Sequence, residues 1–140
     1  MRRATFVLVV LALLLGIPSL SGHGEEPKKG DKLGELMHKK LVASQNVLEG
    51  LALNDFAKIG KQADELMSIS KQAEWNVLKT PKYELYSNDF QRVAGDLAKS
   101  AKDKNIDSAA LNYVELTLTC VKCHKYIRET RDTSIDRPAY

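Results

Sequence analysis

The sequence contains few of the residues that mark several protein classes. Its 140 residues include 2 cysteines, 8 glycines and 4 prolines, and aromatic residues make up 6%. Two cysteines exclude a disulfide-dense scaffold, and the scarcity of glycine and proline disfavours collagen-like and many-turned β-sandwich structures. Hydrophobic residues make up 44% and charged residues 28%, which excludes disorder of the whole chain. The composition indicates one globular, helix-rich domain.

A single long apolar run lies at the start of the chain. It covers residues 6–15, follows Arg2 and Arg3, and ends at Gly16-Ile17-Pro18, before the small residues of 19–22. A membrane-spanning helix needs about 20 apolar residues, whereas this arrangement is typical of a cleavable secretory signal. We expect residues 1–22 to be a signal peptide, the mature protein to be periplasmic, and no stable membrane span to remain.

Most of the basic excess also belongs to this first segment. The chain has 21 Lys and Arg against 18 Asp and Glu, and residues 1–22 hold two arginines and no acid. Removing them lowers the formal net charge from +3 to +1. No concentrated basic stripe interleaved with aromatic residues remains, so nucleic acid is not an expected partner.

Four segments after residue 32 repeat their apolar residues with the 3.6-residue period of a helix. They follow a polar leader at 23–32 and predict helices at about 32–53, 55–77, 82–102 and 107–128. Asn54 and Asp107 are the expected N-caps, and Thr80-Pro81 is the expected break between the second and third helices. The predicted fold is all-α, an antiparallel four-helix bundle over 33–128 with a tail at 129–140.

Each expected helix has an apolar stripe that we assign to the core. Gly95 lies inside the third helix, where glycine is unfavourable, so it indicates a close contact between helices. The stripes are Leu33, Leu36, Met37, Leu41, Ser44, Val47, Leu48 and Leu51; Phe56, Ile59, Ala63, Leu66, Met67, Ser70, Ala73 and Val77; Tyr86, Phe90, Val93, Leu97 and Ala101; and Ala110, Tyr113, Val114, Thr117, Cys120, Val121, His124 and Ile127.

Both cysteines fall in one pentapeptide, Cys120-Val121-Lys122-Cys123-His124. The pattern C-x-x-C-H is the attachment signature of a c-type haem. Two thiols add to the two vinyl groups of the porphyrin, and the adjacent imidazole reaches the iron. Positions i, i+3 and i+4 share one face of a helix, so the sequence predicts one covalent haem c, held by Cys120 and Cys123, with His124 as the proximal ligand.

Three other interpretations of this pentapeptide fit less well. A redox C-x-x-C pair has its first thiol at a helix N-terminus, after a strand, whereas this motif lies late in an expected helix. A zinc site needs four ligands, and the remaining histidines, His23 and His38, show no ligand spacing. A disulfide between positions i and i+3 of one helix would be strained.

The longer string Cys120-Val121-Lys122-Cys123-His124-Lys125-Tyr126-Ile127-Arg128 resembles the C-terminal end of the cytochrome c′ family, the class II c-type cytochromes. The similarity extends over about 33–128 and includes Glu35-Leu36-Met37 and the Trp75 to Pro81 stretch. It implies an exported four-helix bundle with the haem near its C-terminus, and a homodimer with no indication of which faces meet. Arg128 lies one turn beyond His124; it is either a residue that pairs with a haem propionate or orients the haem, or a solvated cation that favours the helix dipole.

The resemblance also implies that a position in the first helix decides the function. Family members have there either a methionine that ligates the iron or an apolar residue that leaves a coordination position open. Met37 is the matching residue, in register with Leu41 and Ser44. His38 is the competing ligand, although its helix face is partly polar; Met67 lies on the wrong helix for the family position.

We therefore expect an electron carrier with His124 and Met37 as axial ligands and a redox protein as its partner. The alternative is a protein that binds small gases such as nitric oxide or carbon monoxide at an open or displaceable position. We expect no enzymatic activity, because apart from His38 no residue at a recognisable spacing provides a distal acid–base pair.

Overall fold

The computed structural model describes residues 29–72 and 75–135, and within them it contains four helices and no strand. The expected signal peptide at 1–22 lies outside these residues. The helices are α2 (Lys29–Ala52), α3 (Phe56–Ser70), α4 (Pro81–Lys102) and α5 (Ile106–Ile135). The expectation of an all-helical fold is confirmed. No helix in the described ranges is long and apolar enough to cross a membrane.

The outer ends of the bundle extend further than the periodicity predicted. The first helix begins at Lys29, inside the expected leader of residues 23–32, and the last continues to Ile135, inside the expected tail of 129–140. Both extensions consist mostly of polar residues, and apolar periodicity detects a helical segment only where apolar residues repeat. Ion pairs within a helix support such exposed turns, as between Lys125 and Glu129.

The turn between α2 and α3 has its cap one residue later than expected. Asp55, not Asn54, is the N-cap, and its carboxylate accepts a hydrogen bond of 2.9 Å from the amide of Lys58. Asn54 has a positive φ of 54°, a conformation that asparagine tolerates better than most residues. Asn54 therefore reverses the chain, and the next residue is left to cap α3.

The turn between α4 and α5 is built in the same way. Lys104 has a positive φ of 53°, and the side chain of the next residue, Asn105, accepts a 2.9 Å hydrogen bond from the amide of Ser108. The expected cap, Asp107, lies instead in the first turn of α5, where a negative charge favours the helix dipole.

The connection from α3 to α4 begins earlier than predicted. Helix α3 ends at Ser70 and does not reach Val77, because Trp75 leaves the helical path and its side chain is buried. The predicted break at Thr80-Pro81 is confirmed. Thr80 caps α4 by accepting a hydrogen bond from the amide of Tyr83, and Pro81 takes the first turn, where its missing N–H leaves no helical bond unmade.

The core lies where α3 and α4 pack on each other and on the two outer helices. Predicted core residues of α3 and α4, among them Ile59, Leu66 and Leu97, are fully buried. On α2 the prediction is partly wrong, since Leu41 and Leu48 are 55% and 53% exposed. The largest fully buried side chains are Ile59, Leu66, Ile69, Leu97, Leu116, Val47 and Val93.

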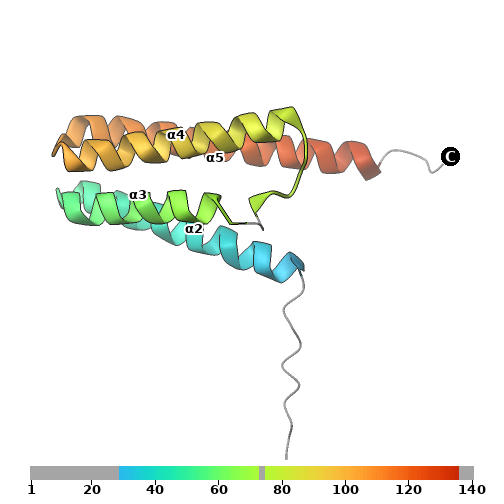
Figure 1. Cartoon of the computed structure of the whole chain (residues 1–140), viewed down its shortest axis with the longest axis horizontal. Coiled ribbons are helices and arrows are strands. Elements are labelled where there is room, and N and C mark those ends of the chain that lie inside the picture. Colours follow the sequence, from blue (N-terminus) through green and yellow to red (C-terminus); the bar gives the residue numbers. More distant parts are fainter. Residues whose placement is uncertain (1–28, 73–74, 136–140) are drawn as a thin grey trace, which may run out of the picture.

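The four helices form two pairs, with α4 and α5 in one layer and α2 and α3 in the other (Figure 1). Contacts are extensive between α2 and α3, α3 and α4, and α4 and α5, whereas α2 and α5 touch far less. The bundle is therefore closed on three sides and open between its first and last helices.

Glycine permits one close approach in the bundle, at the end of α2. A Cβ built on Gly50 would lie 2.9 Å from Cγ1 of Ile59 and 3.3 Å from the carbonyl oxygen of Asp55. Gly95, which the sequence indicated as a contact, has only Met67 nearby, 3.8 Å from its Cβ position. Gly50 is therefore the position in these two helices where the packing excludes a side chain.

Replacing Gly50 by alanine should destabilise the protein by about 1–3 kcal/mol, because the added methyl forces α2 away from the start of α3. The measurement is urea-induced unfolding followed by circular dichroism. Gly34→Ala is the matched control, since nothing lies within 4 Å of its Cβ position and alanine is favoured in a helix by about 1 kcal/mol. Equal stabilisation of both variants would contradict the assigned contact.

Candidate functional site

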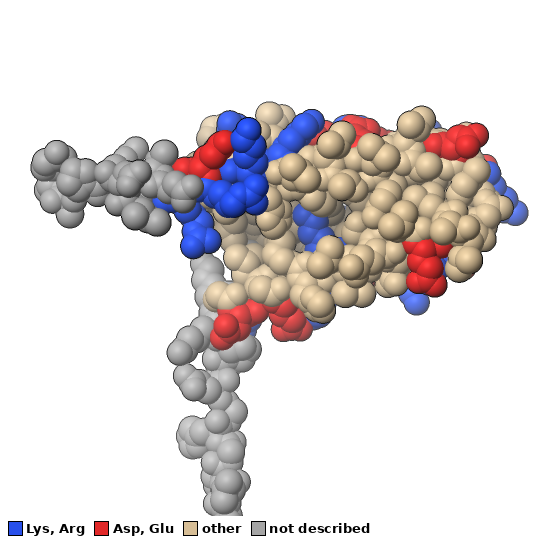
Figure 2. All heavy atoms as spheres, turned by 180° about the vertical axis from the view of Figure 1, so that it is seen from behind, with Lys and Arg blue, Asp and Glu red and all other residues tan. Residues whose placement is uncertain are grey.

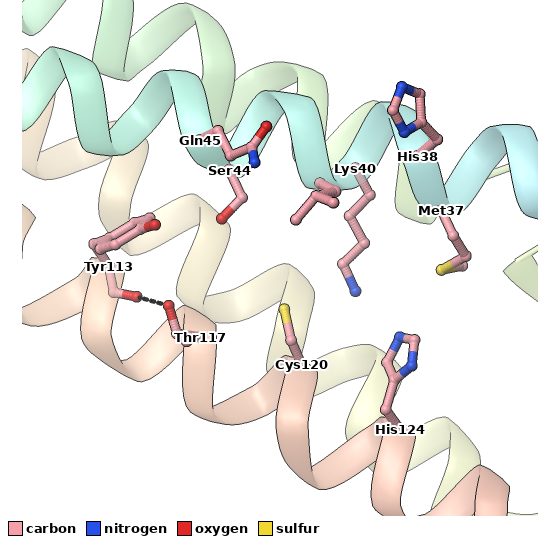
Figure 3. Close-up of a pocket in the computed structure, with 10 residues that line it drawn as sticks. Met37, His38, Lys40, Ser44, Gln45, Tyr113, Thr117, Cys120 and His124 are labelled. Carbon is pink, nitrogen blue, oxygen red and sulfur yellow. Dashed lines mark hydrogen bonds between the residues drawn. The ribbon is translucent and has the colours of Figure 1, made fainter.

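A cavity of about 510 Å³ occupies the open side of the bundle, between α2 and α5. Its volume lies within the range of about 300–1,000 Å³ that is usual for small-molecule and cofactor sites. Figure 3 shows its side chains reaching toward one another from the two helices. The lining residues are Met37, His38, Lys40, Leu41, Ser44 and Gln45 from α2, and Tyr113, Thr117, Cys120 and His124 from α5.

Helix α5 presents the pentapeptide to this cavity. Cys120 and His124 line it, and Cys123 is half-buried against the core on the same part of the helix. The helical spacing brings the two thiols and the imidazole to one side of α5, as predicted. The Cys120 thiol and the His124 imidazole therefore face the cavity, while Cys123 lies beside it against the core.

Helix α2 brings Met37 to the opposite wall. The side chain is half-buried, lines the cavity and extends toward the α5 wall (Figure 3). His38 also borders the cavity, but it is exposed and its ring points away from His124 (Figure 3). Met67, on α3, packs against the core and lies outside the cavity lining.

Lys40 is the site residue that the sequence did not indicate. It is the one charged residue among the buried side chains of 29–72 and 75–131, with 7% of its surface exposed. Its amine lies 4.5 Å from the ring centre of Trp75 and 4.1 Å from that of Phe90. In Figure 3 the side chain extends from α2 toward Cys120 and His124. The cavity thus contains a cation.

Burial and this cation set the electrostatics of the site. Partial burial lowers the pKa of the His124 imidazole, and the charges of Lys40 and Arg128 lower it further. A lowered pKa keeps the imidazole neutral, the form that binds a metal. Burial raises the pKa of the Cys123 thiol, which Lys40 partly opposes. A raised pKa is the opposite of what a redox-active C-x-x-C thiol needs.

A hydrogen-bonded aromatic cluster supports the cavity from behind. The indole N–H of Trp75 donates to the hydroxyl of Ser87 at 2.5 Å, and the hydroxyl of Tyr83 donates to the carbonyl of Trp75. The Trp75 and Phe90 rings are 5.1 Å apart and tilted by 37°. Trp75 is therefore held at both its indole and its backbone, which fixes the ring that faces Lys40.

Arg128 lies one turn beyond His124, is exposed and is not part of the cavity lining. Nearby, Lys82, Lys122 and Lys125 surround a surface hollow, and the Lys82 amine lies 4.9 Å from the ring centre of Tyr126. Figure 2 shows lysine and arginine side chains gathered at this end of the molecule. This end of the bundle carries a local positive charge, although residues 23–140 together have a formal net charge of only +1.

Within the described residues, no group of three or more His, Cys, Asp or Glu side chains is arranged to hold a metal ion. Both cysteines are free thiols. The site therefore lacks the ligand set of a protein-only zinc centre.

No family model, no curated protein and no solved structure matches this chain.

Replacing Ser87 by alanine should destabilise the protein by about 1–3 kcal/mol, because the buried indole N–H of Trp75 loses its acceptor. Urea unfolding followed by tryptophan fluorescence measures this change, since Trp75 is the single tryptophan. Ser68→Ala makes the same substitution at an exposed position of α3 and should change stability by less than about 0.5 kcal/mol. The assigned hydrogen bond is contradicted when the two variants unfold at the same urea concentration.

Proposed function

We propose that this protein is an exported monohaem c-type cytochrome that carries electrons. The observation that supports the proposal most strongly is the position of the C-x-x-C-H motif: Cys120 and His124 line a cavity whose opposite wall carries Met37. The apolar run and flanking arginines of residues 1–22 support export to the periplasm. The resemblance of the motif region to the cytochrome c′ family is in accord with this function.

The residues of the site fit a haem. Two thiols at positions i and i+3 would form thioether bonds to its vinyl groups, and the adjacent imidazole of His124 would ligate its iron. Leu41 and Tyr113 add apolar surface to the cavity wall, against which a porphyrin ring would pack. Bound there, a haem supplies an iron that alternates between the ferric and ferrous states.

Met37 is the proposed sixth ligand. It projects from α2 into the cavity that His124 borders from α5, and a thioether is a suitable ligand for a c-type haem. A histidine–methionine pair raises the reduction potential, which suits transfer of single electrons between proteins. His38 is the weaker candidate because its ring points away from His124 (Figure 3).

The partner of such a carrier would be another redox protein. Lys122 and Lys125 flank Cys123 and His124 in the sequence, and Lys82 lines the same surface hollow as these two lysines. An acidic surface on that partner would be attracted to them electrostatically. The proposal includes no catalytic residue.

The full chain, expressed in a bacterium that exports proteins and attaches haem c, should carry one covalent haem per chain. The measurement is the haem spectrum in alkaline pyridine after denaturation and extraction, combined with the mass of the mature chain. Cys120→Ala/Cys123→Ala should lose the covalent haem, and His38→Ala should keep it. Absence of haem from the wild-type chain, when a known c-type cytochrome acquires it in the same cells, would refute the proposal.

Replacing Met37 by leucine should convert the ferric protein from low-spin to high-spin, because the sixth ligand is lost. Ferrous M37L should then bind carbon monoxide rapidly and completely, whereas the wild-type protein should bind it slowly. Absorption spectra of both oxidation states, with and without carbon monoxide, measure these changes.

Met67→Leu is the matched control, since Met67 lies outside the cavity lining, and its spectra should equal those of the wild type. An unchanged ferric spectrum of M37L would remove Met37 from the ligand set, and a changed spectrum of His38→Ala would assign the position to His38. Immediate saturation of the wild-type protein by carbon monoxide would favour gas binding over electron transfer.

A further inference from the structure

Lys40 occupies a position where lysine is rarely found. It lies on the buried face of α2, in line with Leu36, Ala43 and Val47, and only 7% of its surface is exposed. Lysine is almost never fully buried unless it is paired. Among the described residues, no carboxylate lies within ion-pair distance of its amine. Lys40 is therefore buried with no carboxylate of the described residues as its ion-pair partner.

Two aromatic rings and a thiol surround the amine instead. The ring centres of Trp75 and Phe90 lie within 4.5 Å of it, and the negative faces of aromatic rings attract a cation most strongly away from water. Burial lowers the pKa of Lys40, while the thiols of Cys120 and Cys123 oppose this change. The two rings therefore favour the charged form of the Lys40 amine, and this amine lies beside the cysteines.

The charge of Lys40 acts on the attachment motif. It contributes to the lowered pKa of His124 and opposes the raised pKa of Cys123, although burial is the larger cause in both. In Figure 3 the side chain of Lys40 extends from α2 toward Cys120 and His124. The cation is thus aimed at the three side chains that would hold the haem.

We propose that Lys40 sets the redox equilibrium of this protein: its buried ammonium group stabilises the reduced state of the haem that Cys120 and Cys123 hold. The inference rests on the proposed function. Reduction adds one negative charge to the haem. A buried cation stabilises this charge far more than a cation in water does, because the dielectric constant of the protein interior is low. Lys40 is a positioning residue for charge; it is neither a ligand nor a group that transfers protons.

The neighbouring sulfur favours this role over pairing with a haem carboxylate. The vinyl groups that thiols attack and the propionates lie on opposite edges of a haem. The Lys40 amine interacts with Cys120, so it would lie nearer to the side of a haem that the thiols would hold than to its carboxylates. A unit charge at about 10 Å, in a medium of effective dielectric constant about 20, changes a one-electron equilibrium by about tenfold.

The experiment is a potentiometric titration of the purified holoprotein in three variants. Lys40→Met removes the charge and keeps an unbranched side chain; its equilibrium should shift toward the oxidised state by about tenfold, which corresponds to a potential about 59 mV lower for one electron. Lys40→Arg keeps the charge and should stay within about twofold of the wild type.

Lys39→Met is the matched control. Lys39 is the next residue, is 57% exposed and pairs with Glu35 on the surface, so its removal should change the equilibrium by less than about twofold at low salt. Near 1 M salt that small effect should disappear, because the screening length falls to about 3 Å, whereas the K40M shift should persist.

Several results would overturn the inference. K40M within twofold of the wild type, a K40M shift equal to that of K39M, or a shift that high salt abolishes would each show that no buried charge acts on the haem. A change of ferric spin state in K40M would make Lys40 a ligand instead. Absence of covalent haem from the wild-type chain is a separate result, which refutes the proposed function itself.

The fold of the variant is tested without haem. The Cys120→Ser/Cys123→Ser protein is unfolded in urea with and without K40M. The protein that carries K40M should be at least as stable as the one that keeps Lys40, because an apolar side chain replaces an unpaired buried charge. Should K40M fail to acquire haem, Lys40→Gln, a neutral polar side chain, enters the same titration with the same expected direction, and an unshifted equilibrium in K40Q overturns the inference equally.

Discussion

The separation of α2 from α5 is the constraint on which the rest of this structure depends. A four-helix bundle normally closes by packing each helix against two neighbours. Here α3 and α4 do so, while the two outer helices are held together mainly through these inner ones. The side chains that would otherwise fill the gap, such as Met37 and His124, line a cavity instead. The core formed by α3 and α4 therefore has to supply most of the stability, because α2 and α5 make few contacts with each other.

This difference between the inner helices, α3 and α4, and the outer helices, α2 and α5, explains which parts of the fold the sequence could predict. An inner helix such as α3 has one buried face, and its apolar period identifies that face directly: Ile59, Ala63 and Leu66 are all fully buried. An outer helix has two faces that avoid water, one on the core and one on the cavity. The predicted stripe on α5 mixed these faces. Tyr113 packs against the core and also borders the cavity, but Thr117 is exposed at the cavity. Val114 and Val121 are 57% and 56% exposed, so their assignment to the core was wrong, and Thr119 is the buried polar residue of this part of α5. The apolar period of the sequence predicts that a segment is helical, but it does not distinguish the face on the core from an adjacent face on the cavity.

The candidate site divides in the same way. The pentapeptide of Cys120 and Cys123 is local in sequence, so its chemistry and its shared helix face could be predicted. The buried position of Trp75 could not be predicted, because it depends on a hydrogen bond from its indole to Ser87, which lies beyond the break between α3 and α4. Lys40 was missed because a pattern counts lysine as polar. The signal was nevertheless present: Leu36, Ala43 and Val47 repeat at helical spacing, and Lys40 fills the gap in that buried row.

The aromatic pair explains how the bundle tolerates that lysine. A buried unpaired ammonium is unfavourable, and a methyl-bearing side chain at the same place would remove that cost. The rings that face the amine come from both sides of the helix break, Trp75 after α3 and Phe90 in α4, and Ser87 fixes the first of them. A residue that only filled space would not need these contacts, since leucine would fill the same volume without a polar or aromatic partner. The positions of Lys40 and the two rings agree with the proposed role of the cavity. The protein would keep a positive charge beside the place where a haem, whose charge changes on reduction, would be held.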